Sequence, residues 1–147
     1  TLDGSVLRKS KVKTKMEGEE NRLIADLDFS EELAGDAIRD AVLVSELNVN
    51  GKPAGITTTS FVPPKHLELK PVKISVEPGK DEAGAFLTVS ADCLAKWVCL
   101  SIPKRDVVFS DNFFDLPAGR TVTVRVEGDI EDAALAKVKA HSLRDSY

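Results

Sequence analysis

Apolar and polar residues alternate along most of this chain, and that period of two limits its fold more than any other feature. A β-strand turns successive side chains to opposite faces, so alternation predicts strands that bury one face. The predicted strands are residues 9–15, 23–29, 43–49, 54–62, 72–77, 86–91, 95–102, 107–114, 121–127 and 135–143. Short strands joined by turns predict an all-β, antiparallel β-sandwich. The side chains expected in its core are Val98, Leu100, Val122, Val124 and Val126.

Turn signals agree with this prediction. Asn50-Gly51 separates two predicted strands, and both residue types tolerate the positive φ that a two-residue hairpin turn requires. Helical signals are short: Ser30 predicts one capped turn over residues 30–33, and Asp129 predicts another over residues 129–134. We therefore expect no helix longer than about three turns.

Pro63 and Pro64 mark the predicted domain boundary, because neither can donate a hydrogen bond to a strand ladder. Residues 65–147 offer enough strands for a complete sandwich. Residues 1–64 offer fewer, so we interpret them as a partial module that is truncated at its N-terminus. A chain that begins at Thr1 rather than Met fits an excised fragment.

The partial module would keep an apolar face without a partner. The side chains of that face are Leu23, Leu27, Phe29, Leu43 and Leu47. Packing of the face on the second module, strand exchange with another copy and disorder are all open. The interpretation favours a homodimer through the truncated module, since exposed strand edges tend to pair.

The chain lacks the motifs of common enzyme classes, with no GxGxxG, P-loop, HExxH or GxSxG sequence. Neither of its two histidines, His66 and His141, has a candidate nucleophile assigned to it, so neither is expected to act as a base. Cys93 and Cys99 form neither a CxxC pair nor part of a metal quartet. The sequence predicts no catalytic, cofactor-binding or metal-binding residue.

Two aspartates lie close enough in sequence to suggest an acid and base pair. Asp111 and Asp115 are four residues apart, as paired carboxylates of a glycosidase could be. Asp111-Asn112 fits a turn better, since short polar side chains bond to the nearby backbone. Asp115 precedes the turn-forming sequence Leu-Pro-Ala-Gly. We expect both aspartates to be structural.

Charge and hydropathy argue against nucleic acid and membrane partners. The formal net charge is −4, whereas a nucleic-acid surface needs clustered cations. No apolar run is long enough to cross a bilayer. Lys9, Lys11, Lys13 and Lys15 would line one face of a strand, where they could bind a polyanion. Protection of an edge strand from aggregation explains the lysine row better.

Trp97 is the main candidate for a contact outside the sandwich. It alternates with Val98 and Leu100, so it points outward if those residues point inward. An outward tryptophan can stack on a sugar or pack on a neighbouring domain, and the second is favoured because exposed apolar patches mark interfaces. The residues proposed for such a sugar or interdomain contact are Trp97, Asp111 and Asn112. The phenylalanines expected in the core and corners of the sandwich are Phe109, Phe113 and Phe114.

Two segments resemble a known family. Residues 61–69, Phe-Val-Pro-Pro-Lys-His-Leu-Glu-Leu, and residues 109–116, Phe-Ser-Asp-Asn-Phe-Phe-Asp-Leu, are similar to the C-terminal region of family 2 glycoside hydrolases of the β-mannosidase type. The ending over residues 140–147 is also similar. The chain departs from the family run after Leu116, where one leucine is missing, and at Arg120, where an acidic residue is common.

The resemblance implies immunoglobulin-like modules that accompany a retaining exo-glycosidase. In that family two catalytic glutamates lie on a (β/α)8 barrel, and no part of this sequence resembles the barrel. The implied role is a non-catalytic region that stabilises and positions the catalytic domain of the parent chain, its expected partner. A carbohydrate-binding module with an oligosaccharide partner and a surface adhesion domain are the alternatives. The location implied is periplasmic or extracellular in a bacterium and lysosomal in an animal.

Overall fold

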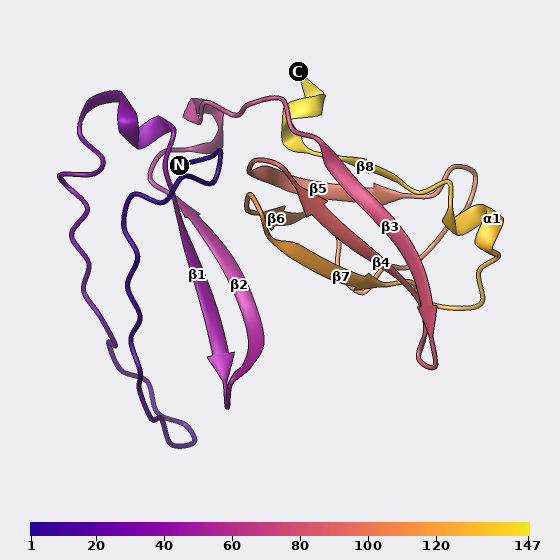
Figure 1. The fold of residues 1–147 in the computed structure, drawn as a ribbon, viewed down its shortest axis with the longest axis horizontal. Coiled ribbons are helices and arrows are strands. Elements are labelled where there is room, and N and C mark those ends of the chain that lie inside the picture. Colours follow the sequence, from indigo (N-terminus) through magenta and orange to yellow (C-terminus); the bar gives the residue numbers. More distant parts are fainter.

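A computed structural model describes residues 1–147 as a β-sandwich with a separate two-stranded hairpin beside it (Figure 1). The sandwich has two three-stranded sheets, ordered β3-β4-β7 and β6-β5-β8, and all paired strands run antiparallel. Its strands are β3 (Ile74–Asp81), β4 (Gly84–Ala91), β5 (Ala95–Ser101), β6 (Phe114–Leu116), β7 (Thr121–Arg125) and β8 (Lys139–His141). The prediction of an all-β, antiparallel sandwich is confirmed.

One apolar core lies between the two sheets and contains residues of both. Val98 of β5 and Val124 of β7 are completely buried, and Leu100 and Val126 are nearly so. Val122 is partly buried and packs against the same cluster. The predicted core is therefore confirmed: these five side chains face the space between the two sheets.

Strand β5 contains a bulge that keeps its apolar residues facing the core. Ala95 pairs with Leu116 and Val98 pairs with Phe114, so Lys96 and Trp97 together stand opposite the single residue Asp115. Ala95 and Val98 are both fully buried, although residues three apart face opposite sides of a regular strand. The additional residue of the bulge resolves this conflict.

The separate hairpin consists of β1 (Val42–Val49) and β2 (Lys52–Ser60). Asn50 and Gly51 connect its strands with φ angles of 51° and 80°, the left-handed values that a type I′ turn requires at both central positions. The predicted hairpin turn is confirmed. A bulge between Leu47 and Asn48 interrupts the pairing near the turn.

A second, smaller core joins the hairpin to one end of the sandwich. Its buried side chains are Leu2, Leu67, Leu69 and Leu94, with Val42, Val62 and Leu143 packed against them. Leu2 also connects the two parts through its backbone, because its N–H donates to the Asp40 carbonyl at 2.9 Å and its carbonyl accepts from the Leu94 N–H at 2.7 Å. The hairpin is thus attached to the sandwich by packing as well as by the chain.

Four predicted strands are wrong in whole or in part. Residues 9–15 and 23–29 form no strand and are almost wholly exposed. Within residues 107–114 only an isolated bridge and the first residue of β6 form, because the chain turns through a positive φ just before β6. Within residues 135–143 only β8 forms. That residues 1–64 are a truncated module stays a prediction.

Helical structure is confined to short turns. A turn over residues 30–34, in which the Leu33 N–H donates to the Phe29 carbonyl at 3.0 Å, leads into the 3-10 helix η1 (Gly35–Arg39). The α-helix α1 (Asp132–Leu135) follows Glu131, so the predicted cap Asp129 lies outside it. The other 3-10 helices are η2 (Pro64–His66) and η3 (Leu143–Ser146). None of these helices has the length and apolar content needed to span a membrane.

Candidate functional site

The bulge of β5 brings Lys96 to the Asp115 carboxylate, at the place where the sandwich meets the hairpin. Asp115 of β6 lies opposite the bulge, and its Oδ2 atom accepts from the Lys96 ammonium at 2.7 Å. The same atom accepts a hydrogen bond from the Thr58 hydroxyl of β2. The Oδ1 atom accepts from the Trp97 backbone N–H at 3.0 Å. One carboxylate therefore holds three segments together.

Burial makes this arrangement strong. The Lys96 side chain is only 9% exposed and the Asp115 side chain 18%, so the ion pair is largely shielded from water. Burial alone raises the pKa of Asp115, but the hydrogen bonds from Lys96, Thr58 and the Trp97 amide outweigh it and leave the pKa below its usual value. Asp115 is thus held as a carboxylate.

A second polar contact fixes the hairpin against the sandwich. The Arg120 guanidinium, just before β7, pairs with the Glu46 carboxylate of β1. Both side chains are about half exposed, so this pair is worth little by itself. Together with Thr58–Asp115 it sets the orientation of the hairpin, which the small apolar core stabilises.

Trp97 points outward from β5, as the alternation predicted, and is 45% exposed. Its φ of 53° is left-handed, which costs a bulky residue about 1–3 kcal/mol and persists only where the surroundings impose it. The Asp115 carboxylate imposes it by accepting the Trp97 N–H. The Lys96 ammonium lies 5.8 Å from the centre of the indole ring. The backbone of Trp97 is therefore fixed, and its half-exposed indole is accessible to a partner.

Phe113, on the neighbouring segment, also combines a left-handed backbone with an exposed aromatic side chain. Its φ is 60° and its side chain is 67% exposed, so its predicted place in the core is wrong, whereas Phe109 and Phe114 do pack against the core. Val98 pairs with Phe114, so the backbones of Trp97 and Phe113 belong to adjacent segments. We call these two exposed aromatic residues the aromatic pair.

The Asn112 side chain forms hydrogen bonds with the backbone of β5. Its Oδ1 atom accepts from the Leu100 N–H at 2.7 Å and from the Phe113 N–H at 3.1 Å, and its Nδ2 donates to the Leu100 carbonyl at 3.1 Å. These bonds continue the pairing of β5 past β6. The side-chain amide is thus occupied within the protein.

The structure separates the roles of the two aspartates. Asp111 is exposed on the turn before Asn112 and has no hydrogen-bond partner, while Asp115 is paired with Lys96. An acid and base pair needs two carboxylates facing one substrate bond, and the Asp115 oxygens face Lys96, Thr58 and Trp97 instead. His66 and His141 are exposed, and both cysteines are free thiols. No three side chains of the His, Cys, Asp or Glu type gather where a metal could bind.

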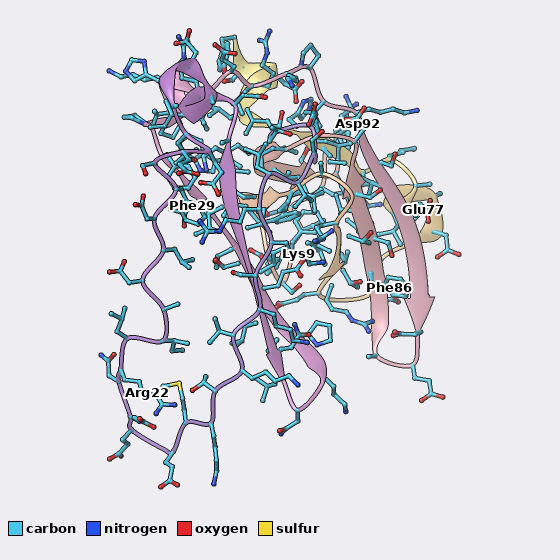
Figure 2. All side chains as sticks on the ribbon, turned by 60° about the vertical axis from the view of Figure 1, so that its left-hand side comes forward. Lys9, Arg22, Phe29, Glu77, Phe86 and Asp92 are labelled. Atoms are coloured by element: carbon cyan, nitrogen blue, oxygen red, sulfur yellow. The ribbon has the colours of Figure 1, made fainter.

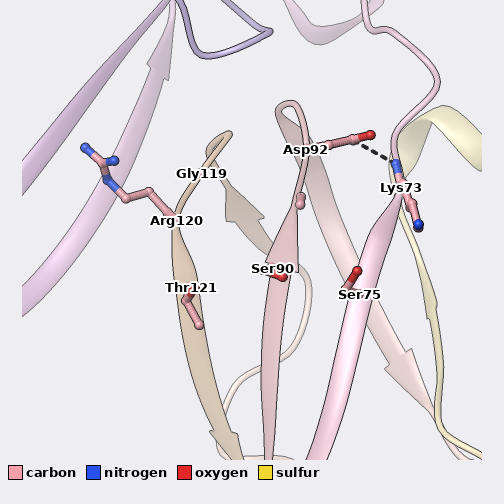
Figure 3. Close-up of a pocket in the computed structure, with 8 residues that line it drawn as sticks. Lys73, Ser75, Ser90, Asp92, Gly119, Arg120 and Thr121 are labelled. Atoms are coloured by element: carbon pink, nitrogen blue, oxygen red, sulfur yellow. Dashed lines mark hydrogen bonds between the residues drawn. The ribbon is translucent and has the colours of Figure 1, made fainter.

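A polar hollow of about 350 Å³ lies at one end of the β3-β4-β7 sheet (Figure 3). Sequence reasoning missed it, and the residues that line it are Lys73, Ser75, Ser90, Ala91, Asp92, Gly119, Arg120 and Thr121. The Lys73 backbone N–H donates a hydrogen bond to the Asp92 Oδ1 atom at 2.9 Å. This bond holds the pKa of Asp92 below its usual value. Binding pockets for small molecules are mostly apolar, and this open hollow has one apolar residue in its lining.

Comparison with known proteins agrees with this geometry. Residues 69–146 match the family model Ig_mannosidase, which describes an Ig-fold domain. The match covers all six strands of the sandwich. No curated protein matches the chain. The sandwich is an accessory Ig-like domain, and the chain belongs to the Ig_mannosidase family of Ig-fold domains.

Proposed function

We propose that this chain is a non-catalytic region of a β-mannosidase-type glycoside hydrolase and that it docks on the catalytic domain through the aromatic pair. Three facts support the proposal: the family match, the resemblance of the segments 61–69 and 109–116, and the absence of an acid and base pair in the sandwich. The parent enzyme would be a retaining exo-glycosidase.

The observation that carries the proposed docking is the strained, exposed backbone of the aromatic pair. Trp97 and Phe113 both adopt left-handed φ angles, and both are held there by hydrogen bonds from their own N–H groups. Strain of this kind concentrates at binding sites. Fixed aromatic side chains lose little entropy on association, which is why tryptophan dominates many interfaces.

A carbohydrate-binding role is the second candidate, because an exposed Trp97 could stack on a sugar ring. Orientation of a sugar also requires free polar groups beside the ring. Most of the neighbouring polar groups are occupied: both Asp115 oxygens accept bonds within the protein, the Asn112 amide both accepts and donates there, and only the exposed Asp111 carboxylate has no partner. This favours docking on a protein over binding of an oligosaccharide.

Calorimetric titration of the chain with the catalytic domain encoded by the parent gene tests the proposal. We expect Trp97→Ala to weaken binding about 30-fold, as loss of a tryptophan hot spot does. Val108→Ala is the matched control, because Val108 is also an exposed apolar residue and lies outside the aromatic pair. Equal loss with both variants would contradict docking through Trp97.

Two further measurements separate the candidates. Titration with manno-oligosaccharides should give no binding heat, and an isotherm abolished by Trp97→Ala would establish the carbohydrate-binding role instead. The chain alone should not hydrolyse aryl β-mannoside, β-galactoside or β-glucosaminide. Turnover that is lost on Asp111→Asn or Asp115→Asn would overturn the non-catalytic assignment.

A further inference from the structure

The turn between β1 and β2 contains the one asparagine of this chain that precedes a glycine. Asn50 is followed by Gly51, whereas the residues after Asn21, Asn48 and Asn112 are Arg, Val and Phe. An asparagine before glycine can react with its own backbone, because glycine has no Cβ atom to hinder the approach of its nitrogen to the side-chain amide. The turn is therefore a candidate site of spontaneous covalent modification.

The two reacting groups of this turn are free of other contacts. The Asn50 side chain is exposed and forms no hydrogen bond, and the Gly51 N–H is free because the ladder joins Val49 and Lys52 on either side of it. A Cβ atom added at Gly51 would meet no atom within 4 Å, so no neighbouring segment covers the turn. The turn lies at the end of the hairpin that is remote from the small apolar core (Figures 1 and 2). Both groups are thus accessible to water.

Asp3-Gly4 is the other place where a side-chain carbonyl of the right length precedes a glycine, and there the structure blocks the reaction. Asp3 Oδ1 accepts from the Thr1 hydroxyl and from the Ser5 N–H at 3.0 Å, and these bonds hold the pKa of Asp3 below its usual value. The carboxyl group therefore stays ionised, and a carboxylate resists attack by a nucleophile. The Gly4 N–H donates to the Thr1 carbonyl at 3.1 Å. The contrast singles out Asn50.

The folded turn itself keeps the Asn50 side chain away from its nucleophile. A type I′ turn is the mirror image of a type I turn, so the ψ angle of Asn50 is about +30° beside its left-handed φ of 51°. In that conformation the Gly51 nitrogen lies on the far side of the Cα–C bond from the side chain, and attack requires the turn to open. The hairpin has only two strands and a small core to attach it. Its opening therefore costs less than unfolding of the sandwich.

We propose that Asn50 is a modification site that the folded hairpin protects, and that its conversion to isoaspartate prevents the hairpin from forming again. In the opened turn the Gly51 nitrogen attacks the side-chain carbon Cγ of Asn50. A C–N bond forms and ammonia leaves, which gives a cyclic succinimide. Water then adds to either carbonyl of the ring and opens it to aspartate or isoaspartate. Water is the only co-reactant, and nothing is oxidised or reduced.

The two products should differ in their effect on the hairpin. Aspartate before glycine also suits a type I′ turn. Isoaspartate carries the main chain through the side-chain carbon and adds one atom to the two-residue loop, whose length fixes the pairing of the strands. The lengthened turn cannot set Val49 opposite Lys52 as the native turn does. Each opening that ends in isoaspartate therefore removes one molecule from those with a folded hairpin.

Incubation of the full chain at mildly alkaline pH, followed by peptide mapping with mass spectrometry, tests the proposal. We expect the mass gain of an amide-to-acid conversion at Asn50 and none at Asn48. Thr58→Val should speed the conversion about fivefold, because it removes the hydroxyl that binds β2 to Asp115 and so favours opening. Thr57→Val is the matched control and should convert at the rate of the unaltered chain, since Thr57 is exposed and its hydroxyl forms no hydrogen bond.

Concentrated urea supplies the reference for an open turn, and all three chains should convert there at one faster rate. Equal rates for the folded chain and the chain in urea would overturn the proposal, because the fold would then give no protection. Equal rates for Thr58→Val and Thr57→Val, or a folded chain that never converts, would also overturn it.

Hydrogen exchange tests the consequence for the hairpin. The isoaspartate form, separated by chromatography, should lose the protection of the β1 and β2 amides, whereas Asn50→Asp should keep it. Asn50→Gly should neither convert nor lose the hairpin, because Gly-Gly also forms this turn. Protected β1 and β2 amides in the isoaspartate form, or unprotected ones in Asn50→Asp, would contradict the proposed effect of the added backbone atom.

Discussion

Lys96 and Asp115 form an ion pair, with 2.7 Å between Nζ and Oδ2, at the place where the hairpin β1–β2 meets the sandwich. Neither charge has free access to water, and the same carboxylate receives the Thr58 hydroxyl and the Trp97 amide. The junction and the exposed aromatic pair therefore depend on one side chain. This relationship leads to the first two predictions.

Asp115→Ala should lower the free energy of unfolding by about 3 kcal/mol, because it leaves the Lys96 ammonium buried without a counter-ion. Chemical denaturation of the purified variant measures this loss. The double variant Lys96→Met, Asp115→Ala is the control and should recover part of it, since the unpaired charge is gone. If the double variant is as unstable as the sum of the single variants, the two residues are not coupled.

The junction should weaken in acid. The pKa of Asp115 is lowered in the folded protein, so its contribution to stability is complete above the unfolded pKa of about 3.9 and is lost as the pH falls through the folded value. Trp97 is the single tryptophan of the chain, and its fluorescence should report the change below about pH 4. The variant Asp115→Asn should lack this step. If Asp115→Asn shows a fluorescence change of equal size below about pH 4, the change belongs to another carboxylate.

Val124→Asp should unfold the sandwich, because Val124 is completely buried in the core and an unpaired buried carboxylate costs several kcal/mol. Val108→Asp makes the same chemical change at a side chain that is 58% exposed and should melt close to the unaltered chain. Thermal unfolding followed by circular dichroism compares the two. Similar melting of both variants would contradict the described core.

Gly79 of β3 lies against the ring of Phe86 on the paired strand β4. A Cβ atom at this position would lie 2.5 Å from the ring atom Cζ, so Gly79→Ala should displace the ring. We expect a loss of about 1–3 kcal/mol, as for other overpacked sites. Gly55→Ala in β2 is the control, since nothing lies within 4 Å of its added Cβ. Equal stability of the two variants would show that the Phe86 ring moves aside at no cost.

Alternation predicted the sandwich because each of its strands has one buried face. Val98, Leu100 and Val124 follow this rule and were correctly placed in the core. Residues 23–29 alternate just as clearly, yet they form no ladder, and all of their side chains except that of Phe29 are exposed. Periodicity describes what a segment can bury, and a strand forms only where another element supplies the opposing surface.

The candidate site was predictable in part. The outward direction of Trp97 followed from the alternation of Val98, Leu100 and Ile102 after it, and all three are buried. The role of Asp115 did not follow, because its partner Thr58 is 57 residues away in the chain and only the packed structure brings them together. Phe113 was expected inside because phenylalanine is apolar. The left-handed backbone that turns it outward depends on the Asn112 side chain.

The bulge in β5 also determines where insertions and deletions can be tolerated in this chain. Removal of either Lys96 or Trp97 would leave a regular strand in which Ala95 and Val98 still face the core, but the Asp115 carboxylate would lose one of its two donors from β5. Relatives that differ in length should therefore keep the full length of residues 95–101 and vary in the loop over residues 103–108, which has no ladder to disturb. The additional residue of the bulge allows a side chain and a neighbouring backbone amide of the same strand to bind one carboxylate.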